Sequence, residues 1–238
     1  MAHTHISIFR NVPTVITCSY SIESANRTRR LKATTIQNGI DATKSYIASQ
    51  DEKKQMRRLL NLPTDKTVFV WAAPFIVRKN PLTAISAFNS SESNWKHHLC
   101  LLGDGPLLEE AKELAREHNN ISFSGMVDNV DDYLKAADCF ISTSLSEGLP
   151  NSVIEALAWG LPAILSDIPA HREVFRFEQE AGSFFPINNL RILTELIQTF
   201  QADSSTRRLS RKIVLDHFDA DSMASNYQAL YSEVLPIP

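Results

Sequence analysis

The strongest constraint on the fold of this chain is the regular alternation of short apolar segments with longer amphipathic segments. Apolar runs of about four to eight residues between turn residues predict buried strands, and longer segments with a helical spacing of apolar residues predict helices. Strands that alternate with helices favour right-handed βαβ units, which build a parallel sheet covered by helices on both faces. We therefore predict an α/β fold with a parallel sheet.

The predicted elements follow one another closely along the chain. We expect strands at residues 12–19, 34–37, 67–72, 98–102, 121–124, 138–143, 163–166 and 182–185. We expect helices at residues 51–60, 81–88, 106–117, 130–135, 151–159, 190–200, 206–218 and 222–234. Residues 39–50 are polar and form the predicted linker between the two opening strands and the main domain.

Length and composition limit the class of protein and its partners. The 238 residues exceed a usual domain of about 100–200 residues, so we expect one complete domain and an incomplete piece of another. Hydrophobic residues make up 43%, which is enough for a sizeable core. The net charge of −3 comes from acidic and basic residues mixed along the chain, and without a basic stripe we expect no nucleic acid partner.

Two further features bear on localisation. The first residues lack the basic and apolar regions of a signal peptide, and no window approaches the ~20 apolar residues of a membrane span. The cysteines Cys18, Cys100 and Cys139 lie in strand-like segments without metal-ligand spacing, which suits buried thiols in a reducing compartment. We expect a cytoplasmic protein, and peripheral contact with a membrane stays open.

One loop has the pattern of an anion site. Ligands on a parallel sheet bind beyond the carboxyl ends of the strands, in loops that lead into helices, and the segment SLSEGLPNSVIE (144–155) is such a loop. Gly148 permits unusual backbone dihedral angles and close approach of a ligand, and Pro150 presets the start of the helix. Unpaired N–H groups then point into the loop from Asn151, Ser152 and Val153. With the helix dipole they favour an anion such as a phosphate.

Two carboxylates flank this predicted phosphate site. Glu147 precedes it, and Glu155 lies about one turn inside the helix. Carboxylates accept hydrogen bonds from the paired hydroxyls of a ribose or a hexose, so the combination indicates a nucleotide sugar. The alternative is that Glu147 is a loop carboxylate favoured near a helix N-terminus and Glu155 is a surface residue of the helix. The residues of this segment alone do not separate the two interpretations.

Several segments together resemble one enzyme family. We find a resemblance to the Glu-x7-Glu signature of glycosyltransferase family 4, the retaining enzymes of the GT-B fold, in ADCFISTSLSEGLPNSVIEALAWGLPAILSD. Further resemblances are the preceding NISFSGMVDNVDDYLKAAD, the Gly-Asp-Gly-Pro turn in LCLLGDGPLLEEAKELA and the phosphate-binding segment VFVWAAPFIVRKNPLTAISAF. The end of the family's N-terminal domain and its crossover are similar to VITCSYSIESAN and TIQNGID. The resemblance covers roughly residues 15–175 in the family's order.

The resemblance implies a fold and a division into domains. The fold would be a Rossmann-like parallel sheet with helices on both faces, the C-terminal half of a GT-B fold. Residues 1–40 would be a remnant of the N-terminal acceptor domain with the crossover, residues 41–218 the nucleotide-sugar donor-binding domain, and residues 219–238 the C-terminal crossover helix. That helix would lack most of its partner and expose apolar positions at Met223, Tyr227, Leu230 and Tyr231.

The resemblance also implies roles for single residues. Glu147 would bind hydroxyls of the transferred sugar and support charge at the reacting carbon, and Lys79 would neutralise the diphosphate as it leaves. Glu155 would bind the nucleotide ribose, and the loop at Met126 and Val127 would line the base. Backbone groups would hold the donor phosphates at Gly148, Leu149, Pro150, Asn151 and Ser152. A tight turn near the donor cleft would be made by Gly103 and Gly105.

One departure from the family pattern concerns the phosphate site. The family usually has an Arg five residues before the phosphate-binding Lys, and this chain has Pro74 there. The loss of that guanidinium leaves less positive charge for a leaving diphosphate. Arg78, beside Lys79, either substitutes for it as a donor ligand or is a solvated side chain, because adjacent residues often point in different directions.

Metal and cofactor expectations follow from the same comparison. Nothing in the chain resembles the Asp-x-Asp metal motif of the other major glycosyltransferase fold, so we expect no metal and no cofactor besides the donor, which is a substrate. His171 lies in a loop that enters a helix, and it either faces the cleft or is a local cap or a surface ring.

The predicted function is that of a glycosyltransferase half. We expect the donor-binding part of an enzyme that transfers a hexose from a nucleotide-diphosphate sugar, with UDP or GDP, to a saccharide or lipid-linked acceptor with retention of configuration. Surface polysaccharide biosynthesis is a role common among such enzymes. The alternatives are a nucleotide-sugar-binding module that is inactive alone because the N-terminal half is missing, and a related enzyme such as a sugar-nucleotide epimerase or a phosphorylase. An N-terminal half supplied by another chain is one way to complete the enzyme.

Overall fold

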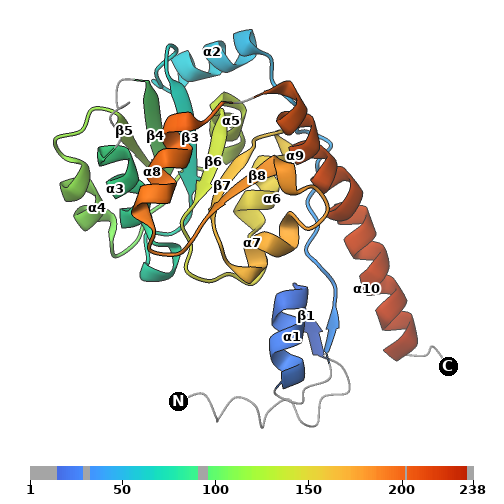
Figure 1. The fold of residues 1–238 in the computed structure, drawn as a ribbon. Helices are drawn as coiled ribbons and strands as arrows, with labels where there is room; N and C mark the ends of the chain where they lie inside the picture. Colours follow the sequence, from blue (N-terminus) through green and yellow to red (C-terminus); the bar gives the residue numbers. More distant parts are fainter. Residues whose placement is uncertain (1–14, 29–32, 91–95, 202, 235–238) are drawn as a thin grey trace.

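The computed structural model describes residues 15–28, 33–90, 96–201 and 203–234, and Figure 1 shows their arrangement. Its centre is a six-stranded sheet with the order β5-β4-β3-β6-β7-β8, in which all neighbours are parallel. The strands are β3 Thr67–Ala72, β4 His97–Leu102, β5 Ile121–Gly125, β6 Cys139–Ser142, β7 Ala163–Ser166 and β8 Gly182–Phe185. The predicted α/β fold is confirmed, as are the predicted bounds of β3, β7 and β8.

The strand order marks the end of the sheet where a ligand is expected. From β3 the chain moves outward through β4 to β5, then returns to the middle at β6 and continues outward through β7 to β8. The direction therefore changes between β3 and β6. In parallel sheets, ligands bind outside the carboxyl ends of the strands at such a switch point. The loops that follow Ala72 and Ser142 begin there.

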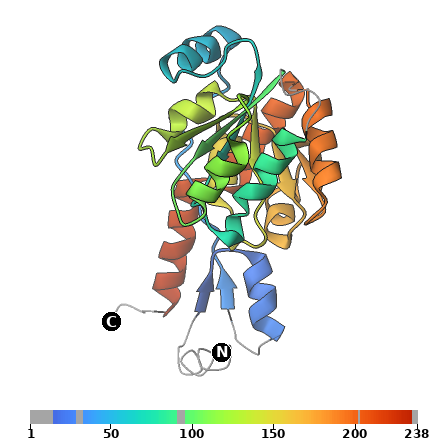
Figure 2. The same ribbon diagram turned by 90° about the vertical axis from the view of Figure 1, so that its left-hand side faces the viewer.

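Helices cover both faces of the sheet, as Figures 1 and 2 show. Alternate residues of β3 face opposite sides, so Val68 and Val70 belong to one buried cluster, and Phe69 and Trp71 to the other. The first cluster includes side chains of α5 Val130–Ala136, α6 Asn151–Ala158 and α9 Ser204–His217. The second includes side chains of α3 Pro81–Asn89, α4 Leu108–Ala115 and α8 Leu190–Thr199. The core therefore consists of two apolar layers, one on each face of the sheet.

Local sequence fixes where several helices begin. α2 Gln50–Leu59 begins with a capping box, in which the side chains of Ser49 and Glu52 each accept a hydrogen bond from the other's backbone N–H. α8 and α9 follow Asn189 and Asp203, whose side chains each accept a hydrogen bond from a backbone N–H of the first turn. These caps satisfy N–H groups that the first turn of a helix leaves unpaired.

The first three described elements form a separate small unit, which we call the N-terminal unit. It consists of β1 Val15–Thr17, α1 Tyr20–Thr28 and β2 Ala33–Thr35, and its two strands pair in parallel in a sheet of their own. The chain crosses to the body of the molecule at Gly39 and Ile40, where Ile40 forms an isolated bridge with Asp219. A Cβ at Gly39 would lie 2.3 Å from the Asp219 carbonyl oxygen, so the two segments approach too closely for a larger residue.

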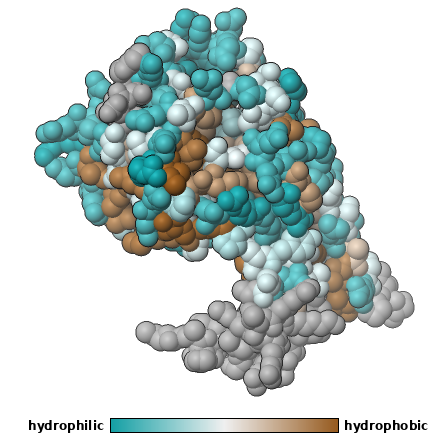
Figure 3. All heavy atoms as spheres, in the orientation of Figure 1, coloured by the Kyte–Doolittle hydropathy of each residue, from teal (hydrophilic) through white to brown (hydrophobic). Residues whose placement is uncertain are grey.

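The last helix, α10 Ala220–Val234, leaves the body beside this crossing and runs alongside the N-terminal unit (Figure 2). None of its described residues is buried. Figure 3 shows hydrophobic residues on the part of α10 that extends beyond the body. Of the apolar positions predicted to be exposed, Tyr231 is exposed, and Met223, Tyr227 and Leu230 are partly exposed.

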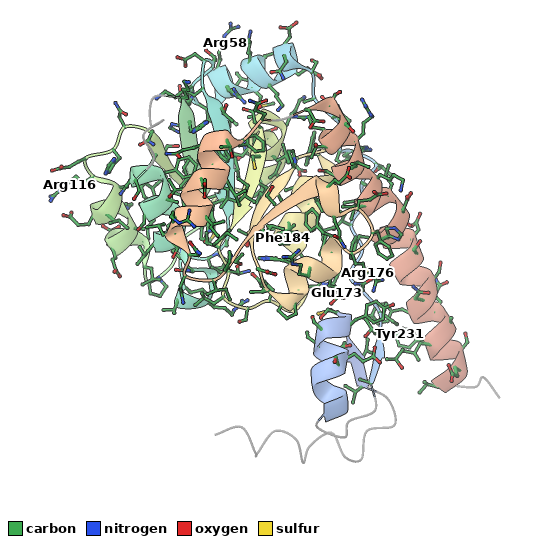
Figure 4. The ribbon with its side chains drawn as sticks, in the orientation of Figure 1. Arg58, Arg116, Glu173, Arg176, Phe184 and Tyr231 are labelled. Atoms are coloured by element: carbon green, nitrogen blue, oxygen red, sulfur yellow. The ribbon has the colours of Figure 1, made fainter. Side chains whose placement is uncertain are left out.

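A buried charge links the N-terminal unit to the body. Glu173, on α7 Pro169–Val174, accepts hydrogen bonds from Tyr20 N at 2.8 Å and Ser21 N at 2.9 Å, one on each carboxylate oxygen. The side chain of Gln37 donates to the same carboxylate at 2.7 Å. Glu173 thus caps the start of α1 and holds the segment after β2, and Figure 4 shows it at the side of α7 that faces α1.

Some predicted boundaries differ from the structure for local reasons. The predicted strand 12–19 begins outside the described residues, and its described part ends at Thr17 because α1 starts soon after it. The helix predicted from residue 106 begins at Leu108, because Leu108 N first closes a turn onto Gly105 O at 3.0 Å. Across the described segments, no helix combines the length and the apolar character that crossing a membrane requires.

Candidate functional site

Glu147 lies in the loop between β6 and α6, at the switch point of the sheet. Its side chain is 6% exposed, and Oε1 accepts hydrogen bonds from Lys79 Nζ at 2.5 Å and from the Ser144 hydroxyl at 2.7 Å. Arg78 donates to Oε2 at 2.8 Å. Burial raises the pKa of Glu147, but hydrogen bonds from Lys79 and Ser144 and the charge of Lys79 outweigh burial and lower the pKa below its ordinary value. The carboxylate is therefore ionised and held by two cations.

Both cations come from the segment after β3, where they belong to the 3-10 turn η2 Val77–Lys79. This segment is bonded to the loop after β6, because the Thr143 hydroxyl donates to Lys79 O at 3.1 Å and Leu145 N donates to Arg78 O at 2.8 Å. Although adjacent in sequence, the two side chains reach the same carboxylate. Lys79 is 14% exposed and Arg78 48%, so Lys79 lies inside the site and Arg78 lies on its rim.

A pocket of about 310 Å³ opens at the same end of the sheet. Its lining residues are Ala72, Ala73, Pro74, Leu102, Gly103, Asp104, Met126, Val127, Val130, Ser152 and Glu155. The structure therefore brings five of the expected site residues together here, namely Gly103, Met126, Val127, Ser152 and Glu155. Most of the lining is apolar. Pro74, which stands where the resembled family has an Arg, contributes to this apolar wall.

Glu155 is the carboxylate on the α6 side of this pocket. Desolvation and, after it, the negative charge of Asp131 raise the pKa of Glu155 above its ordinary value. Its side chain remains accessible to solvent. Within the described segments, no hydrogen bond or ion pair occupies this carboxylate, unlike that of Glu147. Its oxygens are therefore free to accept hydrogen bonds from a ligand.

Gly103 and Gly105 allow two loops to approach each other. They have φ angles of 127° and 152°, which L side chains rarely adopt. A Cβ at Gly103 would lie 2.0 Å from Ala73 O, and a Cβ at Gly105 would lie 2.7 Å from Phe75 O. The tight turn expected here is present. Gly103 contributes to the pocket lining, whereas Gly105 packs against the backbone of Phe75.

The backbone of the loop 148–152 differs from two of our expectations. Gly148 does not have a positive φ, so the expectation of an unusual dihedral angle there is wrong. A Cβ at Gly148 would instead lie 3.2 Å from Ile22 Cδ1 and 3.4 Å from Cys18 Sγ. The small residue thus permits close contact with the N-terminal unit.

The second difference concerns the N–H groups at the start of α6. Asn151 N donates to Leu149 O at 3.0 Å, and Val153 N donates to Pro150 O at 3.0 Å. Two of the three N–H groups expected to point freely into the loop are therefore bonded within it, because the chain closes a turn before the helix begins. Leu149 and Pro150 are buried, so their side chains pack inward. Ser152 stays accessible at the pocket.

One residue that was not among the expected site residues lies next to Glu147. Ser144 donates to its carboxylate, and this was signalled only by its place at the head of the loop.

His171 is fully buried, so the surface-ring alternative is wrong, and α7 has no side-chain cap. His171 Nε2 lies 3.3 Å from the Ser142 hydroxyl, at the end of β6. Across the described ranges, no cluster of three or more His, Cys, Asp or Glu side chains is arranged to hold a metal ion.

Comparison with known proteins adds a family match to this geometry. Residues 52–213 match the family model described as glycosyl transferases group 1. An uncharacterized glycosyltransferase of Methanocaldococcus jannaschii is 32% identical over 151 residues, which are 61% of this chain and 36% of the relative. The UDP-Gal:alpha-D-GlcNAc-diphosphoundecaprenol alpha-1,3-galactosyltransferase of Escherichia coli is 30% identical over 167 residues, which are 67% of this chain and 43% of the relative. The chain thus matches less than half the length of these curated relatives.

Solved structures share the architecture over nearly the whole chain. HepE of Anabaena, solved in complex with UDP and glucose, superimposes with a TM-score of 0.86 at 17% identity, covering 98% of this chain and 68% of that one. A likeness at this identity shows the fold. The predicted relation to one part of the GT-B fold is therefore confirmed.

Proposed function

The chain belongs to the group 1 glycosyl transferases, and on that premise we propose that it is the donor-binding half of a retaining enzyme of glycosyltransferase family 4. In this proposal the enzyme transfers a hexose from a nucleotide-diphosphate sugar to a saccharide or lipid-linked acceptor. The observation that carries the proposal is an ionised Glu147, held by Lys79 and Arg78, at the same end of the sheet as a pocket that contains Glu155.

The two cations bind the donor diphosphate in this proposal. Lys79 lies inside the site and supplies a compact charge, whereas Arg78 lies on the rim with a planar group that pairs well with phosphate oxygens. Arg78 thereby substitutes for the Arg that Pro74 replaces. Its contact with Glu147 supports this role, because a guanidinium bonded to Glu147 is also within reach of a diphosphate bound beside that carboxylate.

The pocket of about 310 Å³ holds the nucleoside. Its apolar wall suits the faces of a base, and Met126 and Val127 lie at its edge. Glu155, which has no protein partner in the described part of the chain, binds the ribose hydroxyls. A UDP donor is our first choice, supported by the UDP-galactose in the name of the Escherichia coli relative and the UDP bound to HepE.

The proposed reaction needs no covalent intermediate with the protein. The bond between the anomeric carbon and the diphosphate oxygen breaks, and its electron pair leaves with the diphosphate. The acceptor hydroxyl oxygen forms the new bond on the same face, and its proton passes to an oxygen of the leaving diphosphate. Glu147 stabilises the positive charge that develops at the anomeric carbon, and Lys79 and Arg78 neutralise the leaving group. Because these side chains supply the charge, the proposal includes no metal ion.

We further propose the division of the chain into an N-terminal remnant with its crossover (1–40), a donor-binding domain (41–218) and a crossover helix (219–238). The acceptor then binds mainly to an N-terminal half, which is either part of a longer chain or supplied by another one. The alternative function is a nucleotide-sugar-binding module that is inactive alone. The extended α10, with no buried residue among those described, favours a missing partner surface.

Calorimetric titration of UDP, GDP and their sugars into the chain tests the proposal. We expect UDP to bind, and we expect Lys79→Ala to weaken binding about 10–100-fold because a charge-assisted bond to phosphate is lost. Lys112→Ala is the matched control, because Lys112 is paired with Glu109 on the exposed side of α4. No nucleotide binding at millimolar concentrations would exclude both functions. Binding without donor hydrolysis or transfer would favour the binding module.

A further inference from the structure

A buried polar network connects the ends of two strands to Glu147. It consists of Ser142 at the end of β6, Ser144 in the following loop, Ser166 at the end of β7 and His171 on α7. All four are buried, from 8% exposed at Ser142 to 0% at His171. Buried hydroxyl and imidazole groups are normally hydrogen-bonded. Because each proton needs an acceptor, the direction of the hydrogen bonds can be deduced from the atoms that only accept.

Two hydrogen bonds determine the form of the imidazole. His171 Nδ1 lies 2.7 Å from Ser166 O, and because a carbonyl oxygen only accepts, Nδ1 carries a proton. Burial lowers the pKa of His171 to about 4, so the ring is neutral near pH 7 and Nε2 has no proton. The Ser142 hydroxyl lies 3.3 Å from both Nε2 and the Ser144 hydroxyl oxygen, so its one proton has two acceptors.

The remaining protons lead from Ser166 to Glu147. The Ser166 hydroxyl donates to Ser144 O at 2.5 Å, and the Ser144 hydroxyl donates to Glu147 Oε1 at 2.7 Å. The imidazole thus holds the backbone of Ser166, the hydroxyl of Ser166 holds the backbone of Ser144, and the hydroxyl of Ser144 holds the carboxylate. His171 Nδ1 also lies 3.3 Å from the Ser166 hydroxyl, whose own proton goes to Ser144 O.

We propose that His171 is a positioning residue for Glu147, acting through Ser166 and Ser144, and that it sets how strongly the site distinguishes a nucleotide sugar from the bare nucleotide. The inference rests on the proposed function, since it takes Glu147 to face the sugar. His171 does not touch the donor. Without its Nδ1 proton the ends of β6 and β7 lose a shared support, and Ser144 shifts relative to the cations. A misplacement of about 1 Å in such a site costs about a hundredfold in rate.

Three variants of the full chain separate positioning from packing. His171→Phe keeps an aromatic ring and removes both hydrogen bonds. His171→Asn keeps an N–H close to the position of Nδ1 and should restore the bond to Ser166 O. Ser144→Ala removes the donor to Glu147 directly. We titrate UDP, UDP-glucose and UDP-galactose by calorimetry and compare, for each protein, the affinity for the preferred sugar nucleotide with that for UDP.

We expect His171→Phe and Ser144→Ala to reduce this affinity ratio about tenfold while the affinity for UDP stays within about twofold, with the ratio largely restored in His171→Asn. The double variant that combines His171→Phe with Ser144→Ala should have the same affinity ratio as Ser144→Ala alone. Both changes act on the same series of hydrogen bonds to Glu147, so their effects should not add. In the wild-type chain, the ¹⁵N shifts of the His171 ring should show the neutral form protonated at Nδ1.

Several outcomes would overturn the inference. If His171→Phe keeps the ratio, or if it lowers the UDP affinity and the melting temperature together with the ratio, His171 does not position Glu147 specifically. A ring protonated at Nε2 excludes the series of bonds whatever the variants do. A wild-type chain that binds UDP without discriminating any sugar also excludes it. A wild-type chain that binds no nucleotide excludes the proposed function itself, which distinguishes the two failures.

Discussion

β6 is flanked by two carboxylates whose surroundings differ. Asp138, just before the strand, accepts hydrogen bonds from Lys53 at 2.7 Å, Arg57 at 2.6 Å and Val68 N at 2.9 Å. The two cations are 1% and 6% exposed and the carboxylate is 14% exposed, and we call this cluster closed because both of its cations are buried. Glu147, after the strand, also holds two cations, but one of them, Arg78, is 48% exposed.

The difference in exposure between the two groups of charges indicates a different role for each carboxylate. Lys53 and Arg57 both belong to α2, and Arg57 also donates to Ala136 O and Lys66 O, so the closed cluster attaches this helix to the sheet. The partners of Glu147 belong to the short turn η2, which makes no comparable helix-to-sheet attachment through them. In the proposed function, two carboxylates with similar partners therefore serve stability at one end of β6 and ligand binding at the other.

The largest expected effect is on the closed cluster. Asp138→Ala leaves two buried cations unpaired and should lower the free energy of unfolding by about 3–5 kcal/mol, measured by urea denaturation. Glu147→Ala should lower it by about 1 kcal/mol, because water reaches Arg78. Equal losses for the two variants would remove the distinction between the clusters.

The second prediction concerns the open cluster, namely Glu147 with Lys79 and Arg78, and tests its proposed catalytic role. Glu147→Gln keeps the size of the side chain and removes its charge, so the developing charge on the sugar loses its stabilisation. We expect donor hydrolysis or transfer to fall about a hundredfold, with a smaller change in UDP affinity. Asp138→Asn serves as the matched control, and a similar fall in that variant, measured where it remains folded, would contradict the assignment.

A smaller effect is expected at the rim. Arg78→Ala should weaken UDP binding about fivefold, less than Lys79→Ala does, because solvent screens an exposed charge. The weakening should decrease as salt is raised from 50 mM to 500 mM. If Arg78→Ala has no effect at low salt, Arg78 does not replace the missing Arg, and the charge lost at Pro74 is uncompensated.

The smallest effect is a pH dependence of the closed cluster. Burial raises the pKa of Asp138, but the charges of Lys53 and then Arg57 outweigh it and lower the pKa below the ordinary 3.8. A carboxyl group with a lowered folded pKa stabilises the fold above its unfolded pKa and loses that contribution as the pH falls. The stability difference between wild type and Asp138→Asn should be nearly constant between about pH 5 and 6, well below the Lys53 pKa of about 8, and shrink below pH 4. A difference that grows on acidification would contradict the direction of the shift.

The sequence predicted the secondary-structure elements better than it predicted which side chains bond to one another. β3, β7 and β8 are short apolar runs between turn residues, so their bounds were readable from the chain. α7 has six residues, too few for a helical apolar period, and it carries both His171 and Glu173. The partners of those two residues lie in other elements, up to 153 positions away, and no local pattern signals them.

The same limit applies within the site. The loop from Glu147 to Glu155 was recognised because strand, glycine, proline and helix follow one another in sequence. The contact of Arg78 with Glu147 could not be deduced, since it depends on how η2 turns relative to the loop after β6. The bonds that occupy the Asn151 and Val153 N–H groups depend equally on the path of the backbone.

Gly148 has a thermodynamic consequence. It directly follows Glu147, and a Cβ there would lie 3.2 Å from Ile22 and 3.4 Å from Cys18 in the N-terminal unit. In the proposed function, a ligand that moves this glycine changes its contact with the unit, so ligand binding and docking of the unit would share a coupling free energy. Coupling of this kind is reciprocal: the factor by which docking changes the affinity for a ligand is the factor by which the ligand changes docking. Under the proposed function, glycine at 148 would therefore couple ligand binding at the loop after β6 to docking of the N-terminal unit.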